Sequence, residues 1–213
     1  SKKYSKIEKI IRCNDKINIL ISPAGSGKTR LLLELAKQGK RILLVEPFIS
    51  VIKNKVESDE ELMKIFETFY GEHSLNDITA SNAITTFDKF SKCNYEKVSK
   101  MFDYICIDES HLLFTSAYRI EATSNAIRKL KELYFISNND PFAGKLILMT
   151  GTETGDTHFF GKIANVIRVT KPAHDKHMEF LVCDDSLDAI TRLSYKTFKL
   201  ISEGYRIMIP TNK

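Results

Sequence analysis

Short apolar runs recur along the chain, and longer amphipathic stretches separate them. Most of the runs are apolar nearly throughout, which is typical of strands in a parallel sheet that is covered by helices on both faces. We therefore expect each run to be a buried strand. The predicted strands are residues 17–22, 41–46, 82–87, 103–109, 145–151 and 165–170.

Helical spacing of apolar residues fills the segments between these runs. Residues 28–38 form one such stretch, and Gly39 after it suits a helix C-cap. Residues 116–135 form another, with apolar side chains on one face. Those side chains are Ala117, Ile120, Ile127, Leu130 and Tyr134. The alternation predicts an α/β fold of three layers with a mainly parallel sheet and right-handed crossovers.

The strand and helix pattern restarts after a polar connector at residues 171–176. It predicts a strand at 178–184, a helix at 186–202 and a strand at 205–210. The helix residues expected to face inward are Leu187, Ile190, Leu193 and Ile201. We expect one domain at residues 1–172 and the truncated start of a second α/β domain at 173–213.

Composition agrees with a globular protein, since hydrophobic residues make up 43% and charged residues 28% of the 213 positions. No apolar run approaches the roughly 20 residues that cross a bilayer, and the polar start does not resemble a signal peptide. We therefore expect no membrane partner and a cytoplasmic location, which includes action inside a host cell if a phage or virus encodes the protein. The net charge of +5 is compatible with nucleic acid but is weak support for it.

The four cysteines stand singly, without a C-x-x-C pair, which argues against a metal site or a disulfide framework. Cys106 lies inside an apolar run and is expected to be a small core residue.

The stretch SPAGSGKT at residues 22–29 follows a predicted strand and opens a predicted helix. Small residues let consecutive backbone N–H groups point at phosphate oxygens, while a lysine reaches the phosphates and a hydroxyl holds Mg²⁺. Ser22 replaces the first glycine of the G-x-x-x-x-G-K-[ST] pattern, but serine is small enough for the turn. The alternative is a glycine-rich turn that binds nothing. The predicted phosphate-binding residues are Ala24, Gly25, Ser26, Gly27, Lys28, Thr29 and Arg30.

A second group of candidate residues ends the strand in DYICIDESHLLF. Asp108 can orient Mg²⁺ together with Thr29, and Glu109 can polarise an attacking water. With Lys28, these two carboxylates are the predicted catalytic residues. The alternative is an ordinary surface turn, because Asp-Glu-Ser is also common in loops.

SPAGSGKT followed by DESH resembles the Walker A and DExH-box pair of superfamily 2 helicases and translocases. The segments at 43–55, 83–90 and 147–154 resemble further motifs of that family in the same order. The resemblance spans roughly residues 17–155. It implies a RecA-like P-loop NTPase that uses ATP and Mg²⁺, and that moves on or unwinds DNA or RNA with a second RecA-like domain in cis.

The resemblance also implies roles for further residues. His111, Thr150 and Thr152 would couple the nucleotide state to the grip on nucleic acid. Pro47, Phe48, Thr85 and Thr86 lie in segments that would face the backbone of the bound strand, where contacts position it without reading its sequence. The alternative for Thr85 and Thr86 is an ordinary strand end with helix-capping chemistry.

Two departures from the family pattern change these expectations. The adenine-binding glutamine is missing upstream, since Gln38 is the single glutamine of the chain. Stacking by Tyr4 or a neighbour, or residues outside this sequence, could replace it. The arginine motif of the second domain is also absent, so we expect this chain alone to bind ATP and to hydrolyse it poorly. A phage packaging motor, a restriction-type translocase and a nucleotide-dependent binding module remain as alternatives.

Overall fold

The structure is a computed structural model of the 213-residue chain. It describes residues 9, 11, 17–72, 75, 78–115, 120–140, 143–152, 164–170 and 186–204. By internal contacts the chain divides into two compact units, Ser1–Lys171 and Pro172–Lys213.

The first unit contains a sheet of seven strands in the order β3-β4-β2-β5-β6-β1-β7, and every pair of neighbours is parallel. The strands are β1 (Ile17–Ile21), β2 (Ile42–Glu46), β3 (Glu67–Phe69), β4 (Asn82–Thr86), β5 (Tyr104–Ile107), β6 (Lys145–Thr150) and β7 (Ala164–Arg168). The six strands predicted for this part are confirmed. The edge strand β3 was missed because three residues are too short to show a strand pattern.

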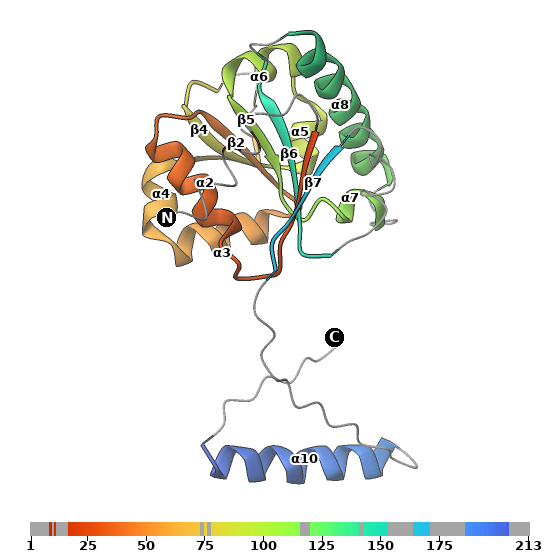
Figure 1. Cartoon of the computed structure of the whole chain (residues 1–213). Helices are drawn as coiled ribbons and strands as arrows, with labels where there is room; N and C mark the ends of the chain where they lie inside the picture. The colour runs from red at the N-terminus through yellow and green to blue at the C-terminus, as the bar shows by residue number, and fades with distance from the viewer. Residues whose placement is uncertain are drawn as a thin grey trace. The chain divides into compact units, whose positions relative to one another are not determined.

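Helices cover both faces of this sheet, as Figure 1 shows. On one face lie α2 (Lys28–Lys37), α3 (Ile49–Ser58) and α4 (Glu60–Ile65). On the other lie α5 (Phe87–Ser91), α6 (Tyr95–Met101), α7 (Leu112–Thr115) and α8 (Ile120–Asn139). Helix α8 extends to Asn139, beyond the predicted end at residue 135, and residues 116–119 lie outside the described part of the chain. The predicted three-layer α/β architecture is confirmed.

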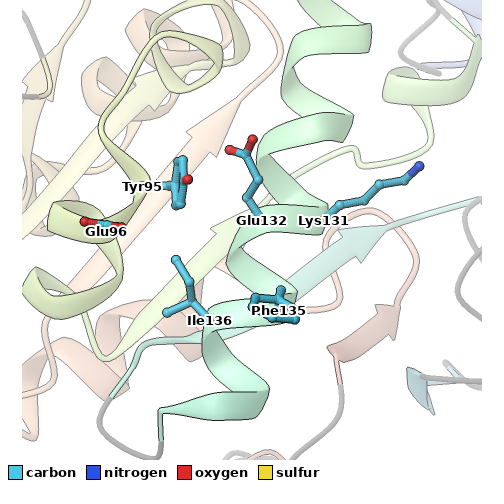
Figure 2. Close-up of a pocket in the computed structure, with 6 residues that line it drawn as sticks. All are labelled: Tyr95, Glu96, Lys131, Glu132, Phe135 and Ile136. Carbon is cyan, nitrogen blue, oxygen red and sulfur yellow. The ribbon is translucent and has the colours of Figure 1, made fainter.

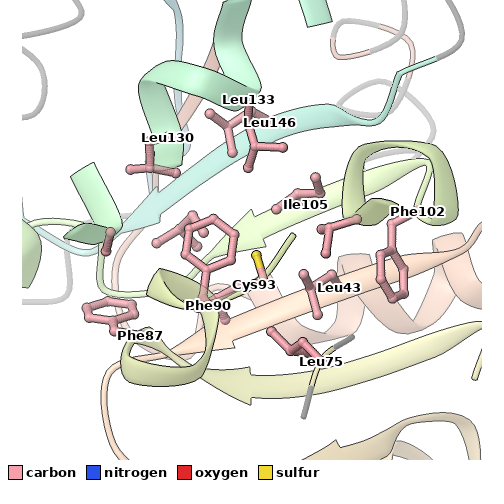
Figure 3. Packing of buried hydrophobic residues seen from close by; sticks show 14 of the residues in the cluster. Leu43, Leu75, Phe87, Phe90, Cys93, Phe102, Ile105, Leu130, Leu133 and Leu146 are labelled. Carbon is pink, nitrogen blue, oxygen red and sulfur yellow. The ribbon is translucent and has the colours of Figure 1, made fainter. Parts of the chain in front are cut away.

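Alternation of side chains along the strands explains why their sequences are apolar nearly throughout. In β2, Leu43 and Val45 join the hydrophobic cluster under α5 and α8, whereas Ile42 and Leu44 join the cluster under α2 and α3. Figure 3 shows the first cluster, in which Phe90 lies close to side chains from several strands and from α8. Cys106 is fully buried in the second cluster, as predicted.

The second unit contains α10 (Ser186–Ser202), which has the predicted bounds. Its apolar side chains were predicted to face inward, and this prediction was wrong. Leu187, Ile190, Leu193 and Ile201 are 46% to 72% exposed. The predicted strands at 178–184 and 205–210 lie outside the described residues. That this unit begins a second RecA-like domain therefore stays a prediction.

None of the helices in the described ranges is both long enough and apolar enough to cross a membrane.

The contrast between two phenylalanines tests the core assignment. Phe90→Ala should lower the free energy of unfolding by about 3–5 kcal/mol, because Phe90 is 1% exposed and its removal leaves a cavity. Phe135→Ala is the matched control: this ring is 70% exposed, so its loss should change stability by less than about 0.5 kcal/mol. Urea unfolding followed by circular dichroism measures both values. Equal losses would contradict the packing described for α5.

Candidate functional site

The loops that follow the strands meet at one edge of the sheet, because all the strands are parallel. The phosphate-loop sequence follows β1, Asp108 follows β5, and Thr150 ends β6, which lies between β1 and β5. Glu46 ends β2 on the other side of β5. The fold therefore collects four chemically distinct segments at this carboxyl edge, although they are spread over more than half of the chain.

The loop at residues 22–29 has the backbone geometry that an anion cradle needs. Gly25 and Gly27 have φ of 63° and 97°, a left-handed conformation that favours glycine. Gly27 is the N-cap of α2, and the first turn of that helix carries no acidic residue. The N–H groups in the first turn of a helix have no acceptor within that helix, so these groups and the positive dipole end of α2 suit a phosphate group.

Contacts within the loop account for the serine at position 22. Its backbone N–H donates to Thr150 O at 2.8 Å, which ties the loop to β6. Its hydroxyl contacts the Ser26 hydroxyl, and its carbonyl accepts from Lys28 Nζ at 3.1 Å. A Cβ on Gly151 would lie 4.0 Å from Lys28 Nζ, so the end of β6 borders the lysine ammonium. Serine at position 22 therefore takes part in the contacts within the loop and between the loop and β6.

Arg30, also predicted to bind phosphate, points its side chain elsewhere. The guanidinium lies 3.0 Å from Glu34 Oε1 and 2.6 Å from Glu61 Oε2. The backbone of Arg30 lies in the first turn of α2, but its side chain is held by these two carboxylates. The guanidinium would have to leave both ion pairs before it could contact a phosphate.

Asp108 and Glu109 form a tight turn after β5. Asp108 is 3% exposed, and its Oδ1 accepts a hydrogen bond from Glu109 N at 3.0 Å. Glu109 has φ of 46°, which is uncommon for a residue with a side chain. Backbone strain of this kind is often held at functional sites, where surrounding contacts maintain it. Here Ser110 N donates to Met149 O at 3.0 Å and fixes the turn to β6.

A chain of polar contacts joins this turn to the end of β6. His111 Nδ1 lies 3.4 Å from Glu109 Oε2 and 3.2 Å from Thr150 Oγ1. The Thr150 hydroxyl donates to Thr152 O at 2.7 Å and accepts from Thr152 N at 3.0 Å. The structure thus brings Glu109 together with the three residues that were predicted to couple nucleotide state to nucleic-acid grip.

Sequence reasoning missed a buried ionic cluster beside Asp108. Lys55 Nζ of α3 lies 2.5 Å from both Asp108 Oδ2 and Glu46 Oε1. Glu46 is fully buried, and its Oε2 has no hydrogen-bond partner within the described part of the chain. Glu46 could have been suspected, because a carboxylate that ends an apolar strand repeats the pattern of Asp108. Lys55 gives no such signal, since it is one of two lysines on an amphipathic helix.

Burial and neighbouring charges perturb this cluster. Burial raises the pKa of Glu46 to about 7; Lys55 opposes the rise, and Asp108 and Glu109 add to it. Burial alone would lower the pKa of Lys55, but the two carboxylates in contact with it raise that pKa above its usual range. Lys55 is therefore held in its charged form.

Most of the residues predicted to face nucleic acid are buried, or their side chains are hydrogen-bonded within the protein. Thr85 is fully buried and its hydroxyl donates to Phe69 O at 2.8 Å. The Thr86 hydroxyl accepts from Lys89 N at 3.4 Å and caps α5, so the capping alternative describes it. Pro47 is buried and Phe48 is the half-buried N-cap of α3. These segments lie at the carboxyl edge, but the two threonine hydroxyls are already bonded within the protein.

A separate groove lies between α6 and α8 (Figure 2). It has a volume of about 380 Å³, and Tyr95, Phe135 and Ile136 form much of its lining. A continuation reaches Ser99 and Asp140, at helix ends that lead into β5 and β6. The groove therefore extends toward the amino edge of the sheet and is not part of the candidate phosphate site.

The fold of this chain aligns with solved ATPase and helicase structures. The fold resembles that of the UvsW helicase from bacteriophage T4, with a TM-score of 0.52 and 16% sequence identity. The alignment covers 78% of this chain and 59% of that one, so the chain spans less than two thirds of the helicase chain. The two proteins share an α/β RecA-like fold.

Residues 2–152 match the family described as "Type III restriction enzyme, res subunit", and the chain belongs to this family. A second solved structure, the SWI2/SNF2 ATPase core of Sulfolobus solfataricus in complex with dsDNA, aligns with a TM-score of 0.46 and 22% identity. That alignment covers 71% of this chain and 31% of the other. No curated protein was found to be similar in sequence.

The raised pKa of Glu46 predicts how stability depends on pH. The folded protein keeps a proton on Glu46 up to about pH 7, whereas the unfolded chain loses it near the ordinary value of 4.5. Between these values the unfolded state binds fewer protons, so this residue makes the free energy of unfolding fall as pH rises. Glu46→Gln should flatten the dependence in that range, measured by urea unfolding at several pH values. The exposed Glu67→Gln is the control and should leave the slope unchanged.

Proposed function

We propose that this chain is the ATP-binding motor domain of a nucleic-acid helicase or translocase that acts inside the cell. The observation that supports this most directly is the shared edge of the sheet. The phosphate loop, the Asp108–Glu109 turn and the contact between His111 and Thr150 all occur there. Membership of the restriction-subunit family agrees with an ATP-driven motor.

In this proposal the loop from Ala24 to Gly27 binds the phosphates of ATP through its backbone N–H groups. Lys28, which borders the loop from the first turn of α2, supplies the positive charge for the terminal phosphates. Its Nζ donates a hydrogen bond to Ser22 O in the structure. On ATP binding, Nζ would leave this carbonyl oxygen and contact a phosphate oxygen instead.

The residues present fit a magnesium ion. Thr29 offers a hydroxyl in the first turn of α2 and Asp108 offers a carboxylate, both of them the oxygen ligands that Mg²⁺ prefers. Within the described ranges no three His, Cys, Asp or Glu side chains are grouped to hold a metal by themselves. That agrees with Mg²⁺, which is commonly bound through one or two carboxylates and substrate phosphates. Bound there, the ion would neutralise phosphate charge during transfer.

Glu109 would orient and polarise the attacking water. Its carboxylate is about one third exposed, so it can reach solvent and the site at the same time. His111, Thr150 and Thr152 connect Glu109 to the end of β6. These three residues would therefore couple the nucleotide state of the site to the binding of nucleic acid. An arginine from a second RecA-like domain in cis would complete the site and stabilise transition-state charge.

Nucleic acid would lie across the carboxyl edge near Pro47 and Phe48. Because the hydroxyls of Thr85 and Thr86 are used within the fold, we propose that their segment contributes backbone groups or neighbouring side chains to the bound strand. A second candidate function is translocation on DNA without unwinding, as the motor of a restriction enzyme. The description of the matched family favours it, and strand-separation and triplex-displacement assays on the protein would distinguish the two.

Removal of Lys28 tests the phosphate site. Lys28→Ala should weaken ATP binding by roughly 10- to 100-fold, because a hydrogen bond to a charged group contributes about 1.5–3 kcal/mol. Lys37→Ala, at the other end of the same helix, is the control and should bind ATP as before. Calorimetric titration with Mg-ATP measures both. Undiminished binding by Lys28→Ala would exclude the phosphate loop as the ATP site.

The role of Glu109 requires a protein that also carries the second domain. There, Glu109→Gln should keep ATP binding but lower turnover by about 10²-fold or more, since the amide cannot accept the proton of water. The exposed Glu121→Gln serves as the control and should hydrolyse ATP at the original rate. Phosphate release under saturating ATP is the measurement. Normal turnover by Glu109→Gln would show that another group activates the water.

A further inference from the structure

The ionic cluster of Glu46, Lys55 and Asp108 joins three elements at the carboxyl edge. Glu46 ends β2, Lys55 comes from the second turn of α3, and Asp108 follows β5. Strands β2 and β5 are hydrogen-bonded neighbours, so the two carboxylates come from adjacent strand ends. Lys55 reaches both of them from above the sheet, with its Nζ 2.5 Å from one oxygen of each.

This arrangement fixes the Asp108 carboxylate from two sides. Oδ1 accepts from Glu109 N at 3.0 Å, and Oδ2 accepts from Lys55 Nζ. The backbone of Asp108 is fixed as well, because its N–H donates to Val45 O at 2.9 Å. A carboxylate with both oxygens and its backbone held cannot rotate freely about its side-chain bonds. Among these contacts, Lys55 supplies the one that depends on a side chain.

Glu46 in turn fixes Lys55. It is fully buried, while the Lys55 side chain is 23% exposed, so the glutamate has no access to solvent and lies beneath the ammonium group. A lysine has a long, flexible side chain and would otherwise lose conformational freedom to stay on Asp108. The buried carboxylate offsets that loss, because a charge-assisted hydrogen bond keeps the ammonium group in place.

We propose that Lys55 is a positioning residue for the magnesium carboxylate: it orients Asp108 for Mg²⁺, and Glu46 holds Lys55 in the orientation that does so. The proposal rests on the function proposed above and adds to it a residue outside the phosphate loop and the Asp108–Glu109 turn. Partners that orient a metal-binding carboxylate typically change metal affinity by about 10- to 100-fold when they are removed.

The alternative is a purely structural ion pair, in which Lys55 merely neutralises the buried Glu46. The two roles predict different behaviour when Glu46 is neutralised by mutation. In Glu46→Gln/Lys55→Met the residue at position 46 carries no charge to neutralise, so a structural role of Lys55 toward Glu46 would no longer be needed. A positioning role would still be lost, because Asp108 Oδ2 would have no partner from α3.

The test measures binding of a fluorescent ATP analogue to the full chain while MgCl₂ is titrated. Lys55→Met should need about tenfold more Mg²⁺ for half-maximal binding, while binding in EDTA stays unchanged. Lys55→Arg should stay within about threefold of the original protein, because a guanidinium can make the same contact. Lys53→Met is the matched control, since Lys53 is exposed on the same helix, and it should behave as the original protein.

The double variant Glu46→Gln/Lys55→Met should be more stable to heat than Lys55→Met, because Glu46 no longer loses a partner, but it should keep the raised Mg²⁺ requirement. It also serves as the test if Lys55→Met alone does not fold. An original Mg²⁺ requirement in either variant would overturn the proposal. If ATP binding by the original chain does not depend on Lys28, the proposed function fails, and the inference about Lys55 fails with it. If Lys28→Ala weakens ATP binding but the Lys55 variants keep the original Mg²⁺ requirement, the proposed function stands and the role of Lys55 is rejected.

Discussion

Parallel pairing of all seven strands, with helices on both faces, is the constraint on which the rest of this structure depends. It buries both sides of each strand, and therefore requires strands that are apolar on both faces. It also directs the carboxyl end of every strand to the same edge. Polar residues that end a strand cannot turn toward either covered face, so they collect at this edge. The candidate site is a consequence of that geometry.

The same constraint creates an electrostatic problem at the edge. Glu46 and Asp108 end adjacent strands and are both almost inaccessible to solvent, so neither charge is well hydrated. Lys55 brings one positive charge to the two carboxylates, which lowers their mutual repulsion. Burial, with a smaller contribution from the charges of Asp108 and Glu109, still raises the pKa of Glu46. A site with excess negative charge beside an anion cradle suits a ligand that combines phosphates with a divalent cation.

The sequence predicted those parts of the fold and site whose determinants are local. Six strands, α2 and α10 follow from hydrophobic periodicity, and the phosphate loop follows from eight consecutive residues. Thr85 and Thr86 were ambiguous because one Thr-Thr pair suits both a helix cap and a phosphate contact, and their hydroxyl bonds decide between them only in the fold. Strand β3 and the exposed face of α10 were missed because each depends on neighbours rather than on its own residues.

By itself, the sequence determined the class of fold and the chemical character of its two strongest motifs, because hydrophobic periodicity and the order of residues in a loop are properties of short segments. Tertiary structure alone decided that Glu46 and Lys55 meet Asp108, and that Glu109, His111 and Thr150 form one polar chain. These contacts join residues from 2 to 53 positions apart in the chain. Their energies depend on burial and distance, which no single segment specifies.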